Sequence, residues 1–178
     1  LPELTGVRKG EGEKTFAQLC KVYGKRSETS ELSLEQIDGI TFRCPDGTIC
    51  ERPWRVPMDL SEVPFVYHDM KKFENKIIYY ETSRGCPFSC SYCLSSIDKR
   101  LRFRSLDLVF NELQFFLDHK VPQVKFVDRT FNCKHDHAMA IWKYIQEHDN
   151  GITNFHFEVA ADLLNEAELA EIAAMRGG

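Results

Sequence analysis

The chain has 178 residues, of which 43% are hydrophobic and 28% are charged, and it contains 10 glycines and 7 prolines. This composition excludes disordered and collagen-like proteins, and the length suits one domain or one domain with a small appendage. The 23 basic and 27 acidic residues give a net charge of −4, which disfavours a nucleic-acid partner. Because the sequence has no apolar run of about 18 residues and no secretion signal, we expect a cytoplasmic protein without a membrane-bound part.

The seven cysteines are odd in number and irregularly spaced. This pattern favours reduced thiols or metal ligands over a disulfide framework. The chain opens at Leu1 without a methionine and ends just after a helical stretch. We therefore expect it to be a piece of a longer protein, with further motifs outside it.

The first 75 residues predict a helix, a hairpin and a connector. After a Gly-Glu-Gly-Glu stretch, four residues recur at the spacing of one buried helix face: Phe16, Leu19, Cys20 and Tyr23. Residues 37–43 and 48–50 flank a Pro-Asp-Gly turn, which predicts a β-hairpin. Three prolines then interrupt residues 51–75, which indicates a connector without regular helix or central strand.

From Lys76 onward, short apolar runs alternate with helical periodicities, as is typical of strand–helix units around a parallel sheet. The candidate strands cover residues 77–80, 124–127 and 155–159. Of three candidate helices, the first follows a capping Ser105 and the second lies around residues 138–145. The third opens with Asn165 and Glu168 in capping-box spacing and presents Leu169 and Ile172 as its apolar face.

The strongest chemical signal is a C-x3-C-x2-C run, Cys86, Cys90 and Cys93, directly after the first candidate strand. Three closely spaced thiolates can hold three irons of a four-iron cluster and leave the fourth iron open to a ligand. Gly85 permits backbone geometry that a side chain would obstruct, and Pro87 stiffens the loop.

A zinc site or purely structural cysteines are the alternatives, because C-x2-C spacing is shared with zinc modules. Zinc modules usually contain a second ligand pair, and Cys44 with Cys50 is a poor version of one. We interpret Cys44 and Cys50 as ordinary thiols. A zinc module would need a fourth ligand such as His68 or His119.

The segment from Glu81 to Cys93 resembles the signature of the radical S-adenosylmethionine (SAM) superfamily, with Tyr92 as the aromatic residue before the last cysteine. The resemblance implies that Cys86, Cys90 and Cys93 hold a 4Fe-4S cluster whose open iron chelates SAM. One electron from the cluster then cleaves SAM to methionine and a 5′-deoxyadenosyl radical. It also implies that Tyr92 lies beside the adenine, the alternative being a core aromatic.

Residues 10–16 resemble the segment that closes the cobalamin (B12)-binding domain of one subgroup of this superfamily. The resemblance implies that residues 1–24 are the C-terminal helix of an upstream cobalamin-binding domain, 25–75 a hairpin and Pro-rich linker, and 76–178 the N-terminal half of the radical SAM barrel. The expected fold is therefore α/β, with the first three strand–helix units of a partial (β/α) barrel after a helix and hairpin. Because the Asp-x-His-x-x-Gly cobalamin motif is absent from the sequence, we expect the cobalamin site to lie mostly outside this chain.

Asp128 follows the second candidate strand and Glu158 lies at the end of the third, where a parallel barrel presents its functional side chains. The resemblance implies that Asp128 holds the amino group of SAM, and we expect Glu158 to contact its ribose or methionine part. The alternatives are a helix-capping or loop aspartate and a surface ion pair. A cationic run at residues 99–104 is interpreted as a solvated face, with carboxylate or phosphate binding as its alternative.

The resemblance implies an enzyme that cleaves SAM reductively, with cobalamin in the parent protein, for methyl transfer or oxidative cyclisation of a small-molecule substrate. A reductant such as flavodoxin or ferredoxin is the expected partner. One alternative is a methylthiotransferase acting on RNA or ribosomal protein, which needs upstream cluster cysteines and a nucleic-acid-binding tail. The other is a zinc-stabilised, non-catalytic binding module. We expect the isolated chain to be inactive, because half of the barrel wall is missing.

Overall fold

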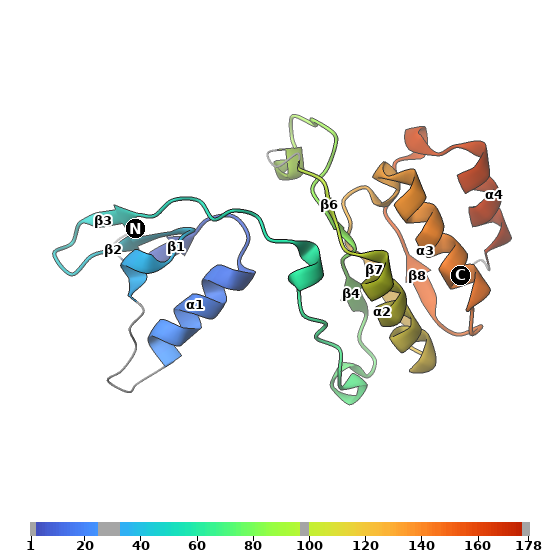
Figure 1. Ribbon diagram of the computed structural model, residues 1–178, viewed down its shortest axis with the longest axis horizontal. Helices are drawn as coiled ribbons and strands as arrows, with labels where there is room; N and C mark the ends of the chain where they lie inside the picture. The colour runs from blue at the N-terminus through green and yellow to red at the C-terminus, as the bar shows by residue number, and fades with distance from the viewer. Residues whose placement is uncertain (1–2, 25–32, 97–99, 176–178) are drawn as a thin grey trace. The chain divides into compact units, whose positions relative to one another are not determined.

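The computed structural model describes residues 3–24, 33–96 and 100–175, and the chain divides into two compact units, Leu1–Met58 and Asp59–Gly178 (Figure 1). The first unit combines the predicted helix with the predicted hairpin. The second contains the end of the Pro-rich connector and all of the predicted strand–helix units. Within the described ranges, no helix has the length and apolar character needed to cross a bilayer.

In the first unit, helix α1 (Glu13–Gly24) packs beside a three-stranded antiparallel sheet with strand order β1-β2-β3. The strands are β1 (Gly6–Arg8), β2 (Ile40–Arg43) and β3 (Ile49–Glu51). The β2–β3 hairpin confirms the sequence prediction, whereas β1 was not predicted, because three exposed residues carry no periodic signal.

Helix α1 turns a different face to the sheet from the one predicted. Phe16 and Tyr23 are 64% and 61% exposed, whereas Thr15 is fully buried and Leu19 packs against the apolar cluster of the unit. The hydroxyl of Thr15 donates a hydrogen bond of 3.0 Å to the carbonyl of Asp38, which fixes the rotation of the helix. Leu19 belongs both to the predicted face, with Phe16 and Tyr23, and to the observed face, with Val22. Because both faces carry apolar residues, the periodicity of the sequence did not decide which one is buried.

The interpretation of Cys44 and Cys50 as separate thiols is wrong, because the structure joins them in a disulfide with a Cα–Cα distance of 6.4 Å. The hairpin register explains the pairing. Phe42 lies opposite Cys50, and the amide of Cys44 donates to the carbonyl of Thr48, so the two cysteines are diagonal neighbours on one face. This register follows from the turn between the strands and is not visible in the cysteine spacing.

The second unit is built on a parallel sheet with strand order β4-β7-β8. Its strands are β4 (Ile78–Tyr80), β7 (Gln123–Phe126) and β8 (Asn154–His156), and its helices are α2 (Leu106–Asp118), α3 (His135–Glu147) and α4 (Glu166–Ala174). A short antiparallel ribbon, β5 (Ser83–Arg84) and β6 (Arg102–Phe103), follows β4. These elements confirm the three predicted strands and three predicted helices, and they form the first three units of a partial (β/α) barrel.

Short 3-10 helices occupy the connections between these elements. They cover Leu34–Gln36, Leu60–Glu62, Met70–Phe73, Leu94–Ser96, Phe131–Cys133 and Ala161–Leu163.

The core of the second unit lies between the sheet and helices α2 and α3, which cover one of its faces (Figure 1). Strand residues alternate as expected: Ile78 and Tyr80 are buried, whereas Tyr79 between them is 56% exposed. Tyr79 pairs in register with Lys125, and Lys125 pairs with His156, so these three residues form a row on the face away from the helices. In a (β/α) barrel that face is the interior.

The third predicted helix, α4, begins as expected but turns its predicted apolar face outward. The capping box between Asn165 and Glu168 is present, which confirms that prediction. Leu169 and Ile172 are 52% and 36% exposed, and the fully buried residue is Glu168, which lies 2.8 Å from Nδ1 of His135 on α3. The side chain of Glu168 reaches back to cap the helix, so the carboxylate and not the apolar stripe faces α3.

Arg104, the last residue of the cationic run, is not part of a solvated face. It is 6% exposed and forms an ion pair with Glu112 of α2, and it donates to the carbonyl of Leu60 at 2.5 Å. The hydroxyl of Tyr80 donates to the same carboxylate at 2.6 Å. Burial and this hydrogen bond raise the pKa of Tyr80 far above its ordinary value. The guanidinium therefore ties α2 to the segment that leads into β4.

Candidate functional site

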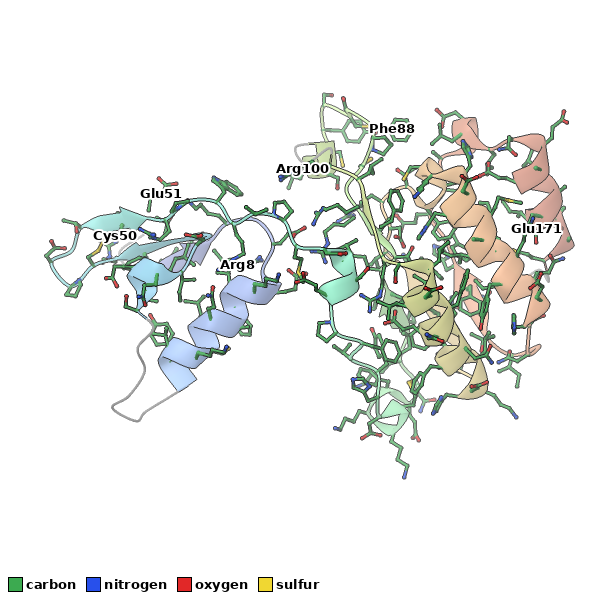
Figure 2. The ribbon with its side chains drawn as sticks, in the orientation of Figure 1. Arg8, Cys50, Glu51, Phe88, Arg100 and Glu171 are labelled. Carbon is green, nitrogen blue, oxygen red and sulfur yellow. A yellow bond between two sulfur atoms is a disulfide. The ribbon has the colours of Figure 1, made fainter. Side chains whose placement is uncertain are left out.

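The cysteine loop, residues 85–101, leaves the sheet at the C-terminal end of β4. The β5–β6 ribbon closes its base, with Ser83 paired to Phe103 and Arg84 paired to Arg102. Figure 2 shows Phe88 and Arg100 on this loop, beyond the end of the ribbon. The loop therefore lies at the edge of the sheet where a parallel barrel places its active site.

Gly85 occupies a backbone conformation that requires glycine. Its φ is +104°, and a Cβ atom built there would lie 2.4 Å from the carbonyl oxygen of Arg100. The expectation that a side chain would obstruct the backbone is therefore confirmed. The close approach brings the two ends of the cysteine loop together.

None of the three cysteines of the motif forms a disulfide; Cys90 is exposed, and Cys86 and Cys93 are partly exposed. The amide of Cys93 donates to the carbonyl of Cys90 at 3.1 Å, which turns the loop tightly between them. Each cysteine of a four-iron cluster binds a different iron, so accessible thiols spread along one loop fit this group. Tyr92, beside Cys93, is 91% exposed, so it is not a core aromatic within the described part of the chain.

The zinc alternative requires four ligands around one ion. Within the residues that the structure describes, no three histidine, cysteine or acidic side chains gather around one point, and this includes the three motif cysteines. Of the two candidate histidines, Nδ1 of His119 lies 2.8 Å from the carbonyl of Phe115 at the C-terminal end of α2, and the ring of His68 packs against Phe65. The end of α2 lies at the sheet edge opposite the cysteine loop, because the helix runs antiparallel to the strands.

Asp128, two residues beyond β7, lies fully buried beside the start of the cysteine loop. Its Oδ1 accepts hydrogen bonds from the amide of Thr82 at 3.1 Å, from the hydroxyl of Thr82 at 3.0 Å and from the amide of Ser83. Burial raises the pKa of Asp128 from 3.8 to about 6, although these hydrogen bonds act to lower it. In the structure, Asp128 thus binds the backbone between β4 and the cysteines through hydrogen bonds. The contact of Asp128 with SAM stays a prediction.

The segment that follows β7, residues 128–132, also forms hydrogen bonds with the residues that follow β8. The side-chain amide of Asn132 donates to the carbonyl of Ala160 at 3.0 Å, and its side-chain oxygen accepts from the amide of Ala160 at 2.9 Å. The amide of Phe131 donates to the carbonyl of Glu158 at 2.9 Å. We call residues 128–132 the post-β7 segment, which connects the cysteine loop on one side with the continuation of β8 on the other.

Sequence analysis missed three polar residues of this arrangement, Thr82, Thr130 and Asn132, which are all buried. The oxygen of the Thr130 hydroxyl lies 3.5 Å from the sulfur of Cys86. The available signal was a cluster of polar residues, at positions 128–130 and 132, directly after a buried strand.

Glu158 lies two residues beyond β8 and forms an ion pair of 3.3 Å with Lys125. Its side chain is 50% exposed, on the face of the sheet away from the helices. The ion pair that the sequence offered as an alternative is therefore present. The contact of Glu158 with SAM stays a prediction, because half of its side chain is exposed and the carboxylate is accessible despite the ion pair.

The fold and the loop together define a class of protein: a partial (β/α) barrel that carries three cysteines, none of them in a disulfide, at the C-terminal end of its first parallel strand. The profile of the Radical SAM superfamily matches residues 80–176, more than half of the chain. The chain belongs to the radical SAM superfamily, which confirms the resemblance.

Curated relatives are longer than this chain. An uncharacterized methyltransferase of Pyrococcus horikoshii is 30% identical over 149 residues, which cover 79% of this chain and 31% of the relative. An anaerobic magnesium-protoporphyrin IX monomethyl ester cyclase of Synechocystis sp. is 30% identical over 98 residues, which cover 52% of this chain and 19% of the relative. The chain therefore spans about a third or less of the curated relatives it matches.

Solved structures with the same fold include OxsB, a cobalamin-dependent SAM radical enzyme determined with aqua-cobalamin and SAM bound. It matches with a TM-score of 0.70 and 22% identity, over 95% of this chain and 25% of that chain. The radical SAM methyltransferase TsrM from Kitasatospora setae, with tryptophan and a SAM analogue bound, matches with a TM-score of 0.66 and 19% identity, over 96% of this chain and 35% of that chain. These matches confirm the partial-barrel fold.

Replacing Gly85 with alanine should destabilise the protein by about 2–4 kcal/mol, because the left-handed backbone and the clash with Arg100 act together. Gly151→Ala is the matched control, since Gly151 has a φ of +70° but no atom lies within 4 Å of the position that a Cβ would take. It should cost only about 1–2 kcal/mol of conformational strain. Urea unfolding of both variants measures the difference, and equal losses would show that the approach to Arg100 is unimportant.

Asp128→Asn should change how stability depends on pH. A carboxyl whose pKa is raised on folding contributes stability that is complete below its unfolded pKa and is lost as the pH rises through its folded pKa, here from 3.8 to about 6. The unfolding free energy of the unsubstituted chain, minus that of the Asp128→Asn variant, should therefore fall by up to about 3 kcal/mol across this window. Urea unfolding between pH 4 and pH 7 tests the sign, and a difference that is constant or rises with pH would contradict it.

Proposed function

We propose that this chain is the cluster-binding part of an enzyme that cleaves SAM reductively, with a 4Fe-4S cluster on Cys86, Cys90 and Cys93. The observation that carries the proposal is the set of three cysteines, none of them in a disulfide, on a loop at the C-terminal end of β4. When bound, the cluster supplies the electron that cleaves SAM to methionine and a 5′-deoxyadenosyl radical.

The residues around the thiols have distinct proposed roles. Cys86, Cys90 and Cys93 would each hold one iron, which would leave the fourth iron of the cluster for the amino and carboxylate groups of SAM. Gly85 brings the ends of the loop together without a side chain in the way. The exposure of Tyr92 leaves both faces of its ring accessible, which supports the proposed stacking against adenine.

Asp128 and Glu158 differ in how they would support the cofactor. Because Asp128 is fully buried and already binds Thr82 and Ser83, we propose that it acts by holding the loop. Glu158 is half exposed on the interior face of the sheet, which supports its proposed contact with the ribose or methionine part of SAM.

For the reaction, we propose methyl transfer or oxidative cyclisation of a small-molecule substrate with cobalamin in the parent protein. The support comes from relatives and structural neighbours, which include a methyltransferase, a cyclase and a cobalamin-dependent enzyme. We further propose that residues 1–24 end an upstream cobalamin-binding domain and that residues 76–178 open the barrel. The cobalamin site would then lie mostly outside this chain.

The proposed chemistry also requires an electron donor. A cytoplasmic flavodoxin or ferredoxin is the proposed partner, because both deliver single electrons at low potential. An open iron reacts readily with oxygen, so a reducing compartment suits this site.

Anaerobic reconstitution with iron and sulfide should give about four irons per chain, as a three-cysteine cubane site requires. Cys90→Ala should abolish iron binding, because it removes one of three ligands. The Cys44→Ala/Cys50→Ala double variant is the control and should keep its iron, since these residues form the hairpin disulfide. Iron and sulfide assays measure both. A preparation that takes up zinc but refuses iron, or equal iron loss from the control, would overturn the ligand assignment.

The isolated chain should bind SAM weakly and release no 5′-deoxyadenosine in a substrate-dependent manner. The reason is geometric, because three strands supply only part of the wall that shields a radical from water. The measurement compares the reconstituted 178-residue chain with a longer form of the protein, both reduced with dithionite. Turnover by the chain at the rate of the longer form would show that the site is complete within these residues.

A further inference from the structure

The hydroxyl group of Thr130 lies beside the first cysteine of the loop. Its Oγ1 is 3.5 Å from Sγ of Cys86, although the two residues are 44 positions apart in the sequence. Thr130 is 5% exposed, and Cys86 is partly buried. Sulfur accepts hydrogen bonds at longer distances than oxygen, so this separation is within hydrogen-bonding range for an O–H group.

The position of Thr130 is fixed by its neighbours in the post-β7 segment. Asp128 attaches the segment to the backbone that leads into the cysteine loop, and Asn132 attaches it to Ala160 beyond β8. The amide of Cys133 donates to the carbonyl of Thr130 at 3.1 Å. The backbone that carries the hydroxyl is thus anchored on both sides of Thr130, beside the sulfur of Cys86.

A cysteine that binds iron is a thiolate and carries no proton, so in that state only the hydroxyl can donate. A donor to a ligand sulfur stabilises negative charge on the cluster, and the reduced cluster carries one more negative charge than the oxidised cluster. Hydrogen bonds to the sulfurs are one of the means by which proteins set cluster potentials. The effect is stronger in a buried site, where the local dielectric constant is low.

We propose that Thr130 donates a hydrogen bond to the Cys86 thiolate and thereby raises the reduction potential of the cluster. Thr130 is a positioning and tuning residue in this proposal, since it acts through Cys86. The proposal rests on the function proposed above, in which Cys86 binds the cluster. It adds a residue outside the cysteine motif that would control how readily the cluster accepts an electron.

The test is an EPR-monitored redox titration of the reconstituted protein and three variants. Thr130→Val replaces the hydroxyl with a methyl group of similar size and should shift the midpoint potential to a more negative value. Thr130→Ser keeps the hydroxyl and should restore the parent potential. Thr153→Val is the matched control, because Thr153 is also buried (2% exposed) but lies beside Asn150 before β8, and its midpoint should not change.

Iron content, measured on the same samples, separates the two proposals. If the parent binds no iron, the proposed function fails. If Thr130→Val binds about four irons per chain with the parent midpoint, the role of Thr130 is wrong and the proposed function stands. A shift as large in Thr153→Val would also overturn it, because the effect would then be a general loss of stability.

A second readout covers the case in which Thr130→Val does not fold. Pulsed ENDOR of the reduced parent protein, prepared in water and in deuterium oxide, should detect an exchangeable proton coupled to the cluster. Thr130→Ala should lose this signal, and Thr130→Ser should keep it. Absence of the exchangeable coupling in the parent protein would overturn the proposal without any variant.

Discussion

The arrangement of the cysteine loop depends on one buried carboxylate, that of Asp128. A carboxylate without solvent is unfavourable unless it is hydrogen-bonded, and here two amides and a hydroxyl from Thr82 and Ser83 provide the donors. The raised pKa shows that these donors compensate for burial only in part. Because Asp128 follows β7 and Thr82 follows β4, the interaction joins the C-terminal ends of two neighbouring parallel strands where the loop begins.

The two ends of the cysteine loop are held more firmly than its tip. Thr82 binds Asp128 through its amide and accepts from the amide of Arg104 at 2.8 Å through its carbonyl, so both sides of the loop converge on one residue. Arg104 is in turn paired with Glu112 of α2. By contrast, Tyr92 at the tip is 91% exposed. A fixed base with an exposed tip is the division expected of a loop that must position a group and still admit a ligand.

The sheet of the second unit has unlike faces. Helices α2 and α3 cover one face with an apolar core, whereas Tyr79, Lys125 and His156 form a polar row on the other. The polar row therefore lies on the face that a (β/α) barrel turns toward its interior. These features agree with membership of the radical SAM superfamily.

The sequence by itself determined most of the elements and the superfamily of the chain. The three parallel strands, the hairpin, the helices, the cysteine motif and the need for glycine at position 85 followed from local signals: apolar periodicity, caps and motif spacing. Tertiary structure decided which faces of α1 and α4 are buried, because the Thr15 hydrogen bond and the Glu168–His135 contact override the apolar periodicity. It also decided the Cys44–Cys50 disulfide, and the contact of Thr130 with Cys86. These features join residues through strand register or across long sequence separations, and no local pattern carries that information.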